Sequence, residues 1–90
     1  ADPQISPDGS RVVYQVTKIH DAAKNEKSTN LWLINRDGSG SRQLTYSSKS
    51  DSHPRWSPDG TMILFESTRD GSSQLYILDL VRGGEPKKLT

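Results

Sequence analysis

The chain consists of two copies of one sequence unit, and this repeat limits its fold more than any other feature. Each copy opens with a proline-led Ser-Pro-Asp-Gly segment and closes with Leu-Thr. The aligned segments are residues 3–14 with 54–65, 30–34 with 74–78, and 42–45 with 87–90. The unit is about 45 residues long, which is the usual length of one four-stranded blade of a β-propeller. The sequence therefore predicts two blades, residues 1–45 and 46–90.

The Ser-Pro-Asp-Gly segment of each unit has the composition of a tight turn. Proline presets φ at the second position, aspartate suits the third, and glycine tolerates the positive φ that often follows. We expect these residues to join a short first strand to a second strand in each blade. The predicted turn residues are Ser6, Pro7, Asp8 and Gly9 in the first unit, and Ser57, Pro58, Asp59 and Gly60 in the second.

The remaining pattern predicts strands and no helix. Second strands are expected at Arg11–Val16 and Met62–Ser67, where β-branched and aromatic residues are frequent. Third strands are expected at Asn30–Asn35 and Gln74–Leu80, and their nearly continuous apolar runs predict burial on both faces. The predicted fold is all-β: two four-stranded antiparallel blades of a propeller that is partial or closes by oligomerisation.

The two units differ between their second and third strands. The first unit has a long stretch at residues 17–29, which we expect to be a hairpin loop, whereas the second has only residues 68–73. Strand alternation places this loop on the same rim as the connection at residues 46–52. Insertions in repeat proteins often collect on a binding face, and long loops are also tolerated without any function. Both interpretations of the loop, including its Lys18–Thr29 portion, stay open.

The motif Pro-Arg-Trp-Ser-Pro-Asp-Gly at residues 54–60, with Gly-Gly-Glu-Pro at residues 83–86, resembles the repeats of two propeller groups. One is the N-terminal propeller of the prolyl-oligopeptidase superfamily, above all its acylaminoacyl-peptidase branch; the other is the TolB propeller. The first resemblance implies a non-catalytic segment of a propeller that covers a separate hydrolase domain and admits peptides to its active site. The absence of cysteine fits a reducing compartment, and the expected location is the cytoplasm. The second resemblance implies a protein-binding propeller without enzymatic activity, in the periplasm. A self-assembling propeller module without enzymatic activity is a further alternative.

The residues themselves predict no catalytic centre, no cofactor and no metal site. The nucleophile-elbow pattern Gly-x-Ser-x-Gly does not occur, and there is no cysteine. His20 is expected to be solvated in the long loop, and His53 to be a hydrogen-bonding residue at the start of a strand.

Four further side chains have predicted positions. Arg55 lies on a first strand, the strand that lines a propeller's channel, where it contacts either a peptide carboxylate or a structural acidic partner. Three aromatic residues are predicted to pack in the core between blades: Trp32, Trp56 and Tyr76.

Charge and composition restrict the partners. Twelve Lys and Arg residues against eleven Asp and Glu residues, interleaved along the chain, argue against a nucleic-acid or membrane surface. Repeat folds generally need three or more units, so two blades leave apolar faces that need partners. The expected partners are the remaining blades and hydrolase domain of a longer chain, or copies of this chain in a trimer or tetramer. Peptides are the expected ligands.

Overall fold

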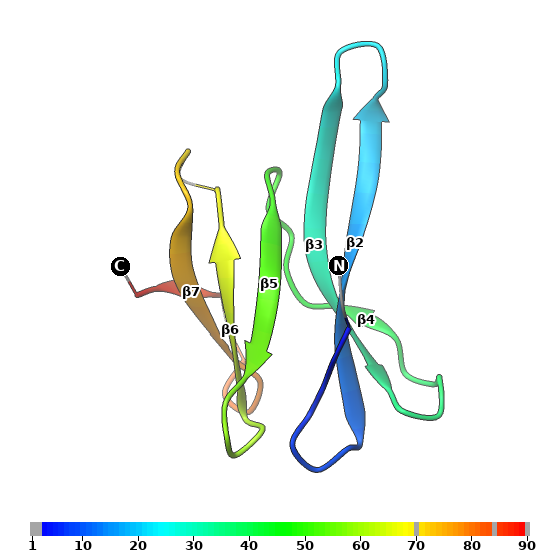
Figure 1. Ribbon diagram of the computed structural model, residues 1–90, viewed down its shortest axis with the longest axis vertical. Coiled ribbons are helices and arrows are strands. Elements are labelled where there is room, and N and C mark those ends of the chain that lie inside the picture. Colours follow the sequence, from blue (N-terminus) through cyan, green and yellow to red (C-terminus); the bar gives the residue numbers. More distant parts are fainter. Residues whose placement is uncertain (1–2, 70, 84, 90) are drawn as a thin grey trace.

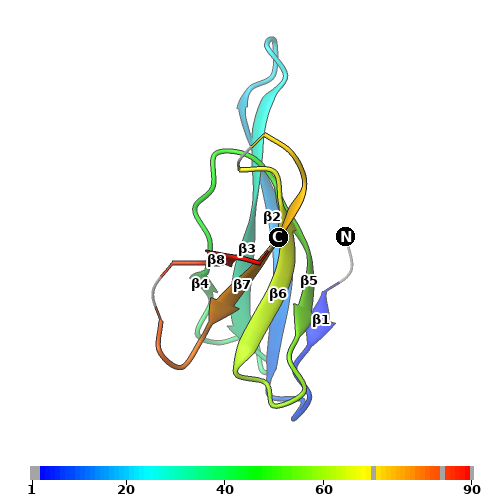
Figure 2. The same ribbon diagram turned by 90° about the vertical axis from the view of Figure 1, so that its left-hand side faces the viewer.

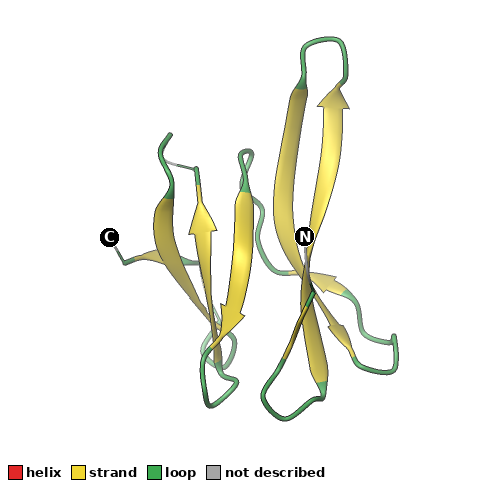
Figure 3. Ribbon diagram, in the orientation of Figure 1, coloured by secondary structure: helices red, strands yellow, loops and turns green. Residues whose placement is uncertain are grey.

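The computed structural model describes residues 3–69, 71–83 and 85–89, and the regular structure of these residues is entirely β-strand (Figure 3). Each half of the chain forms one four-stranded antiparallel sheet with its strands in chain order. The first sheet, blade 1, contains β1 (Gln4–Ile5), β2 (Arg11–Asp21), β3 (Glu26–Asn35) and β4 (Arg42–Gln43). The second sheet, blade 2, contains β5 (Asp51–Trp56), β6 (Met62–Ser67), β7 (Gln74–Asp79) and β8 (Lys87–Lys88). The predicted fold class is confirmed.

The two blades stand side by side (Figure 1). After a turn of 90°, β1 and β5 lie toward one side of the molecule, and β4 and β8 lie toward the other (Figure 2). β1 and β5 also contact each other directly. Because blades are arranged around a central channel in a propeller, with their first strands innermost, the β1 and β5 side is the channel side.

One hydrophobic core lies between the blades. Every side chain in it is 5% exposed or less. Because successive residues of a strand point to opposite faces, only alternate residues of each strand contribute to it. The core consists of Val13, Leu31 and Leu33 from blade 1, and Ile63, Phe65, Tyr76 and Leu78 from blade 2.

Among the described residues, only one face of each third strand is fully covered, so the predicted burial of both faces is seen on one face alone. In β3, Leu31 and Leu33 are buried, whereas Trp32 and Ile34 are only half-buried. In β7, Leu75 is 37% exposed. A sheet has two faces, and each of the two described blades can cover only one face of the other.

β2 and β3 continue beyond the body of blade 1 as a two-stranded arm formed by residues 17–29 (Figure 1). The prediction of a loop over this range is wrong for most of it, since only residues 22–25 form the turn. Pairing across the arm explains the difference. The Thr17 and Thr29 hydroxyls are hydrogen-bonded at 2.8 Å, and His20 Nε2 lies 2.7 Å from the Ser28 hydroxyl. β-branched and hydroxyl side chains paired in this way extend a ribbon.

The base of the arm is joined to the segment that connects the two blades. The N–H of Thr29 donates to the carbonyl of Lys49 at 2.9 Å, and Thr29 forms a parallel bridge with Ser50. The arm and the connection between blades therefore share one rim, as predicted.

Candidate functional site

The two predicted turns, Ser6–Gly9 and Ser57–Gly60, have the same geometry. In each, the glycine N–H donates to the serine carbonyl at 2.9 Å, and the glycine has a φ of 75° or 73°, which L side chains rarely adopt. The serine hydroxyl donates to the aspartate two residues later, at 2.7 Å in the first turn and 2.6 Å in the second. Each turn thus joins the first strand of its blade to the second with the same hydrogen bonds.

These hydrogen bonds set the ionisation of the turn aspartates. Side-chain hydrogen bonds from Ser6 and Ser10 lower the pKa of Asp8 from 3.8 to about 2. The equivalent pair of hydroxyls lowers the pKa of Asp59 to about 2 as well. Both carboxylates are therefore ionised acceptors at neutral pH, which suits a structural role and not proton transfer.

Trp56 joins the blades on the channel side. Its indole N–H donates to the carbonyl of Gln4 at 3.0 Å, and the Arg11 guanidinium lies 5.2 Å from the centre of its ring. Arg11 also donates to the carbonyl of Gly60 at 3.0 Å, in the second turn. An indole that combines apolar packing, a cation–π contact and a hydrogen bond is an effective link between two sheets.

The other two predicted core aromatics lie in different places. Tyr76 is 5% exposed in the core between the blades and stacks on Phe65 with ring centroids 6.0 Å apart. Trp32 lies outside that core, on the half-buried opposite face of blade 1. Leu31 and Leu33, its neighbours in β3, occupy the face toward blade 2, so Trp32 does not pack between these two blades. Its packing against a further blade stays a prediction.

Arg55, the predicted channel residue, lies on β5 with an exposed side chain. It donates to the carbonyl of Pro54 at 3.3 Å, and no ion pair is formed by it among the residues the structure describes. With Leu64 and Leu75, Arg55 lines an open hollow of about 360 Å³ on the face of blade 2 that points away from blade 1.

His53 lies beside Arg55 and is not at the start of the strand. It lies within β5 at a break in the register, and its φ of 53° is unusual for a side chain other than glycine. Its Nδ1 lies 2.7 Å from a carboxylate oxygen of Glu66, and its N–H donates to the Gln15 side chain of blade 1 at 3.2 Å. Arg55 and Glu66 both line the hollow on this face of blade 2, so it presents side chains of both charge signs.

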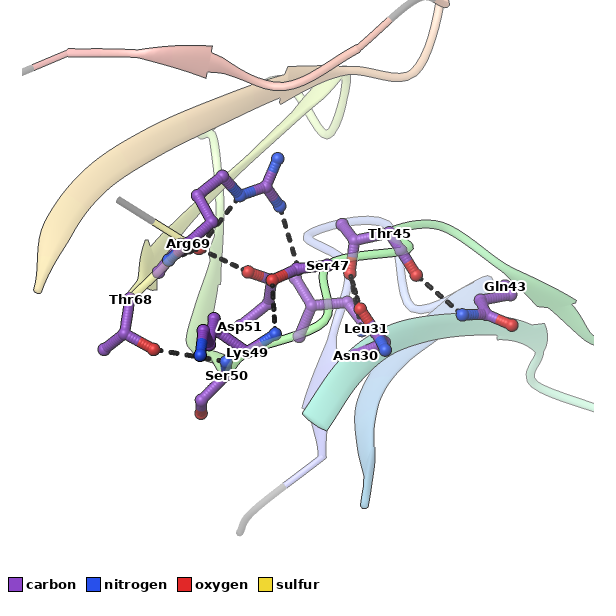
Figure 4. A network of polar contacts seen from close by, with 11 residues as sticks. Asn30, Leu31, Gln43, Thr45, Ser47, Lys49, Ser50, Asp51, Thr68 and Arg69 are labelled. Carbon is purple, nitrogen blue, oxygen red and sulfur yellow. Dashed lines mark hydrogen bonds and ion pairs between the residues drawn. The ribbon is translucent and has the colours of Figure 1, made fainter. Parts of the chain in front are cut away.

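A polar network lies at the start of β5, on the rim that carries the arm, and Figure 4 shows it from close by. Asp51 is fully buried and accepts hydrogen bonds from the Ser67 hydroxyl and, at 2.9 Å, from Nη2 of Arg69. Nε of Arg69 donates to the Ser67 hydroxyl at 2.9 Å. The guanidinium also lies 4.8 Å from the ring centre of Tyr76 and 5.7 Å from that of Phe65. The buried carboxylate is therefore fully paired, as a buried charge needs to be.

A second group of hydrogen bonds lies in blade 1, where β4 leads into the connection between the blades. The Thr45 hydroxyl accepts from the N–H of Leu31 at 3.0 Å and donates to the Asn30 side chain at 3.3 Å. Gln43 donates to the carbonyl of Thr45 at 2.8 Å. Thr45 is 1% exposed, so these bonds satisfy polar groups that water cannot reach.

Asp51, Ser67 and Arg69 were missed by reasoning from the sequence. A repeat is recognised from the residues that its units share, and these positions are not shared: the first unit has Val16 and Lys18 where the second has Ser67 and Arg69. The usable signal was this difference: the second unit has a serine and an arginine where the first has a valine and a lysine.

Neither a metal centre nor a hydrolytic triad is assembled by the described residues. No group of three or more His, Cys, Asp or Glu side chains is placed there to hold a metal ion. His20, which is exposed, contacts Ser28, but no described carboxylate orients its second ring nitrogen as a triad requires. His53 contacts both the Ser52 hydroxyl, at 3.2 Å, and Glu66, at 2.7 Å, through the same nitrogen, Nδ1, so it does not lie between them as a triad histidine does. The described part of the chain also contains no helix long and apolar enough to span a membrane.

Comparison with known proteins places this geometry in a family. The sequence profile described as TolB beta propeller domain matches residues 1–90. The chain is 40% identical over 90 residues, 99% of its length, to the Bacillus subtilis protein named Uncharacterized peptidase YuxL. It is 39% identical over 71 residues, 79% of its length, to Dipeptidyl-peptidase 5 of Porphyromonas gingivalis. It spans only 13% and 10% of these two relatives.

A solved structure shows the same architecture. The β-propeller domain of the Trilobed protease from Pyrococcus furiosus superposes on the whole chain with a TM-score of 0.72 at 24% identity, and the match covers 26% of that domain's chain. The predicted resemblance to peptidase propellers and to TolB is confirmed. The paired blades, their repeated turns and the match along the entire sequence together show that this chain belongs to the TolB β-propeller domain family.

Proposed function

We propose that the chain is a non-catalytic part of a propeller that controls which peptides reach the active site of a serine peptidase. The observation that carries this proposal is the 40% identity, along 99% of the chain, to a protein named as a peptidase. In this proposal the hydrolase domain and the remaining blades belong to other parts of the protein, and the whole is cytoplasmic. The two described blades supply channel wall and scaffold.

The exposed faces of the blades support the need for further blades. Blade 2 presents Leu64, Leu75 and Ile77 on its free face, half-buried or exposed. Their repeat counterparts in blade 1 are the fully covered core residues Val13, Leu31 and Leu33. Likewise Val12, Tyr14, Trp32 and Ile34 on the free face of blade 1 are the counterparts of four core residues of blade 2. Each free face thus has the composition of a face that another blade covers.

A second candidate function is a TolB-type propeller that binds proteins and carries no enzyme, and it is located in the periplasm. The family description favours it. Because the two free faces of one chain correspond to the two sides of its own interface, copies could also cover each other head to tail and close as a trimer or tetramer. Light scattering on the purified chain tests this last form: a discrete trimer or tetramer supports it, and a folded monomer contradicts it.

The proposal that the propeller controls which peptides reach the active site, here called the gating proposal, is tested on the full-length protein that carries this chain. Hydrolysis of short peptides is measured with free and with amidated C-termini, alongside a folded protein substrate. We expect peptides to be cleaved and the folded protein to be spared. The Arg55→Ala variant is expected to raise KM several-fold for peptides with a free carboxylate and to leave amidated peptides unchanged, since Arg55 has an exposed cation with no described acidic partner.

Arg42→Ala is the matched control, because Arg42 is also exposed but lies on β4, away from the channel side. Equal effects of the two substitutions would rule out a channel role for Arg55. Absence of any peptidase activity in the full-length protein would rule out the gating function and favour the TolB-type alternative.

A further inference from the structure

A cavity of about 410 Å³ opens between the two blades, beside the connection from β4 to β5. This volume lies in the range typical of small-ligand sites. Its lining comes from both blades: from the connection that follows β4, from the segment after β6 and from the segment before β8. The side chains that matter to its chemistry are Leu44, Tyr46, Ser47, Arg69, Glu85 and Pro86.

Arg69 lines this cavity, and its guanidinium is held in place. Its side chain is 24% exposed, and it is held by Asp51, by Ser67 and by the ring of Tyr76. In Figure 4, its other terminal nitrogen, Nη1, points away from Asp51. No acceptor for Nη1 is found among the residues that the structure describes. A guanidinium that is already immobilised loses little entropy when it binds a ligand.

The charges around the cavity favour a ligand that carries both an anionic and a cationic group. Asp51 already neutralises Arg69, and Glu85 adds an exposed carboxylate with no partner in the described part of the chain. A ligand that is only an anion would be repelled by Glu85, whereas a ligand with a separate cationic group would be attracted to it. The Ser47 hydroxyl oxygen accepts the N–H of Lys49 at 3.0 Å, which leaves its O–H free to donate.

The remaining lining is suited to an apolar group. Leu44 and Pro86 are both half-buried. The ring of Tyr46 is 77% exposed and is positioned by its hydroxyl, which donates to the carbonyl of Gln43 at 3.3 Å. An exposed aromatic ring with a fixed orientation provides contact area at low entropic cost.

We propose that this cavity binds a short zwitterionic peptide. Its carboxylate accepts hydrogen bonds from Nη1 of Arg69 and from the Ser47 hydroxyl, and its ammonium group pairs with Glu85. An apolar side chain of the peptide packs on Tyr46. Such a peptide would bind whether or not the chain is joined to a hydrolase, because no residue of the site comes from outside the two blades.

The test is isothermal titration calorimetry with three probes on the longest folded form of the protein that carries this chain. The probes are alanyl-leucine, N-acetyl-alanyl-leucine, which lacks the ammonium, and alanyl-leucinamide, which lacks the carboxylate. We expect alanyl-leucine to bind with a Kd on the order of 1 mM, as suits so small a ligand. Each capped probe should bind about tenfold more weakly, as expected for the loss of one charged hydrogen bond.

Two exposed positions connect the probes to the cavity. Glu85→Gln should remove the difference between alanyl-leucine and its acetylated form while the preference for a free carboxylate persists. Tyr46→Ala should weaken alanyl-leucine about fivefold, by loss of a ring contact. Glu26→Gln, on the exposed arm, is the matched control and should change nothing. Equal affinity for all three probes, or no heat of binding at millimolar concentration, would overturn the proposal without reference to any variant.

Discussion

The two blades share their turns and their strand order, but they end differently on the rim that carries the arm. In blade 2 the second strand ends at Ser67, and Arg69 folds back over Tyr76 and Phe65 to pair with buried Asp51. In blade 1 the strand continues past the counterpart positions into the arm, where Thr17 and Thr29 are hydrogen-bonded and Lys18 is exposed. One blade closes its edge with a buried ion pair, and the other extends it into solvent.

This difference shows that the two units share the residues that form the strands, turns and core of a blade, and that their residues differ at the rim. The core positions need only apolar side chains of suitable size, so both units keep them. A buried charge needs its partners in place, so Asp51, Ser67 and Arg69 have to occur together. The chemistry that distinguishes one blade from the other therefore lies where the repeat is broken.

The largest expected effect comes from breaking the buried pair. Asp51→Ala would leave the Arg69 guanidinium partly buried without its counter-ion and the Ser67 hydroxyl without its acceptor. Loss of one partner of a buried pair costs about 3 kcal/mol or more of unfolding free energy. Urea denaturation followed by circular dichroism measures it. Lys18→Ala, at the counterpart of Arg69 in blade 1, should change stability by less than about 0.5 kcal/mol. Similar losses in both variants would mean that the two rims are energetically alike.

A smaller loss of unfolding free energy is expected from substitutions of the two tryptophans, and it should be greater for Trp56, which links the blades, than for Trp32, on the free face. Trp56→Leu would remove the hydrogen bond to the carbonyl of Gln4 and the contact with Arg11, and it should lower stability by about 2 kcal/mol. Trp32→Leu, on the free face of blade 1, should cost less than about 1 kcal/mol in the isolated chain. The same pair of variants in a full-length propeller sharpens the comparison: the cost at Trp32 should rise toward that at Trp56 if another blade covers it.

The smallest expected effect is on the pH dependence of stability, and it concerns the turn that both blades share. The pKa values of Asp8 and Asp59 are both lowered to about 2 from 3.8, so each turn contributes stability that is fully present above about pH 4. That contribution is lost as the pH falls from 4 toward 2, because the carboxylates become protonated. Thermal unfolding across pH 2 to 5 should show a shallower decline in Asp8→Asn and in Asp59→Asn, and by similar amounts. An effect confined to one variant would show that the turns are not equivalent.

Much of the fold followed from local sequence patterns. The turns at Ser6–Gly9 and Ser57–Gly60 could be placed because proline, aspartate and glycine each restrict the backbone at a known position. The strands β6 and β7 were located to within one residue because alternating or β-branched runs predict them directly. The arm was not identified as strand, since threonine, lysine and histidine in a polar stretch are equally typical of a loop until their partners across the ribbon are known.

The candidate sites were less accessible. Arg55 could be assigned to a channel-side strand from its place after Pro54. The role of Asp51 could not be inferred, because an aspartate in a serine-rich connection has no local mark of burial. The cavity at Arg69 brings together residues near positions 46, 69 and 85, and no pattern in the sequence relates them.

The sequence by itself determined the repeat, the two-blade architecture and the apolar character of both blade faces, because these depend on short-range periodicity and turn chemistry. Only the tertiary structure decided which face of each blade is covered, that Trp56 and not Trp32 lies between the blades, and that Asp51 is buried against Arg69. Those outcomes depend on how two sheets meet in space. Contacts between residues far apart in the chain are determined by packing, and packing is a property of the whole fold.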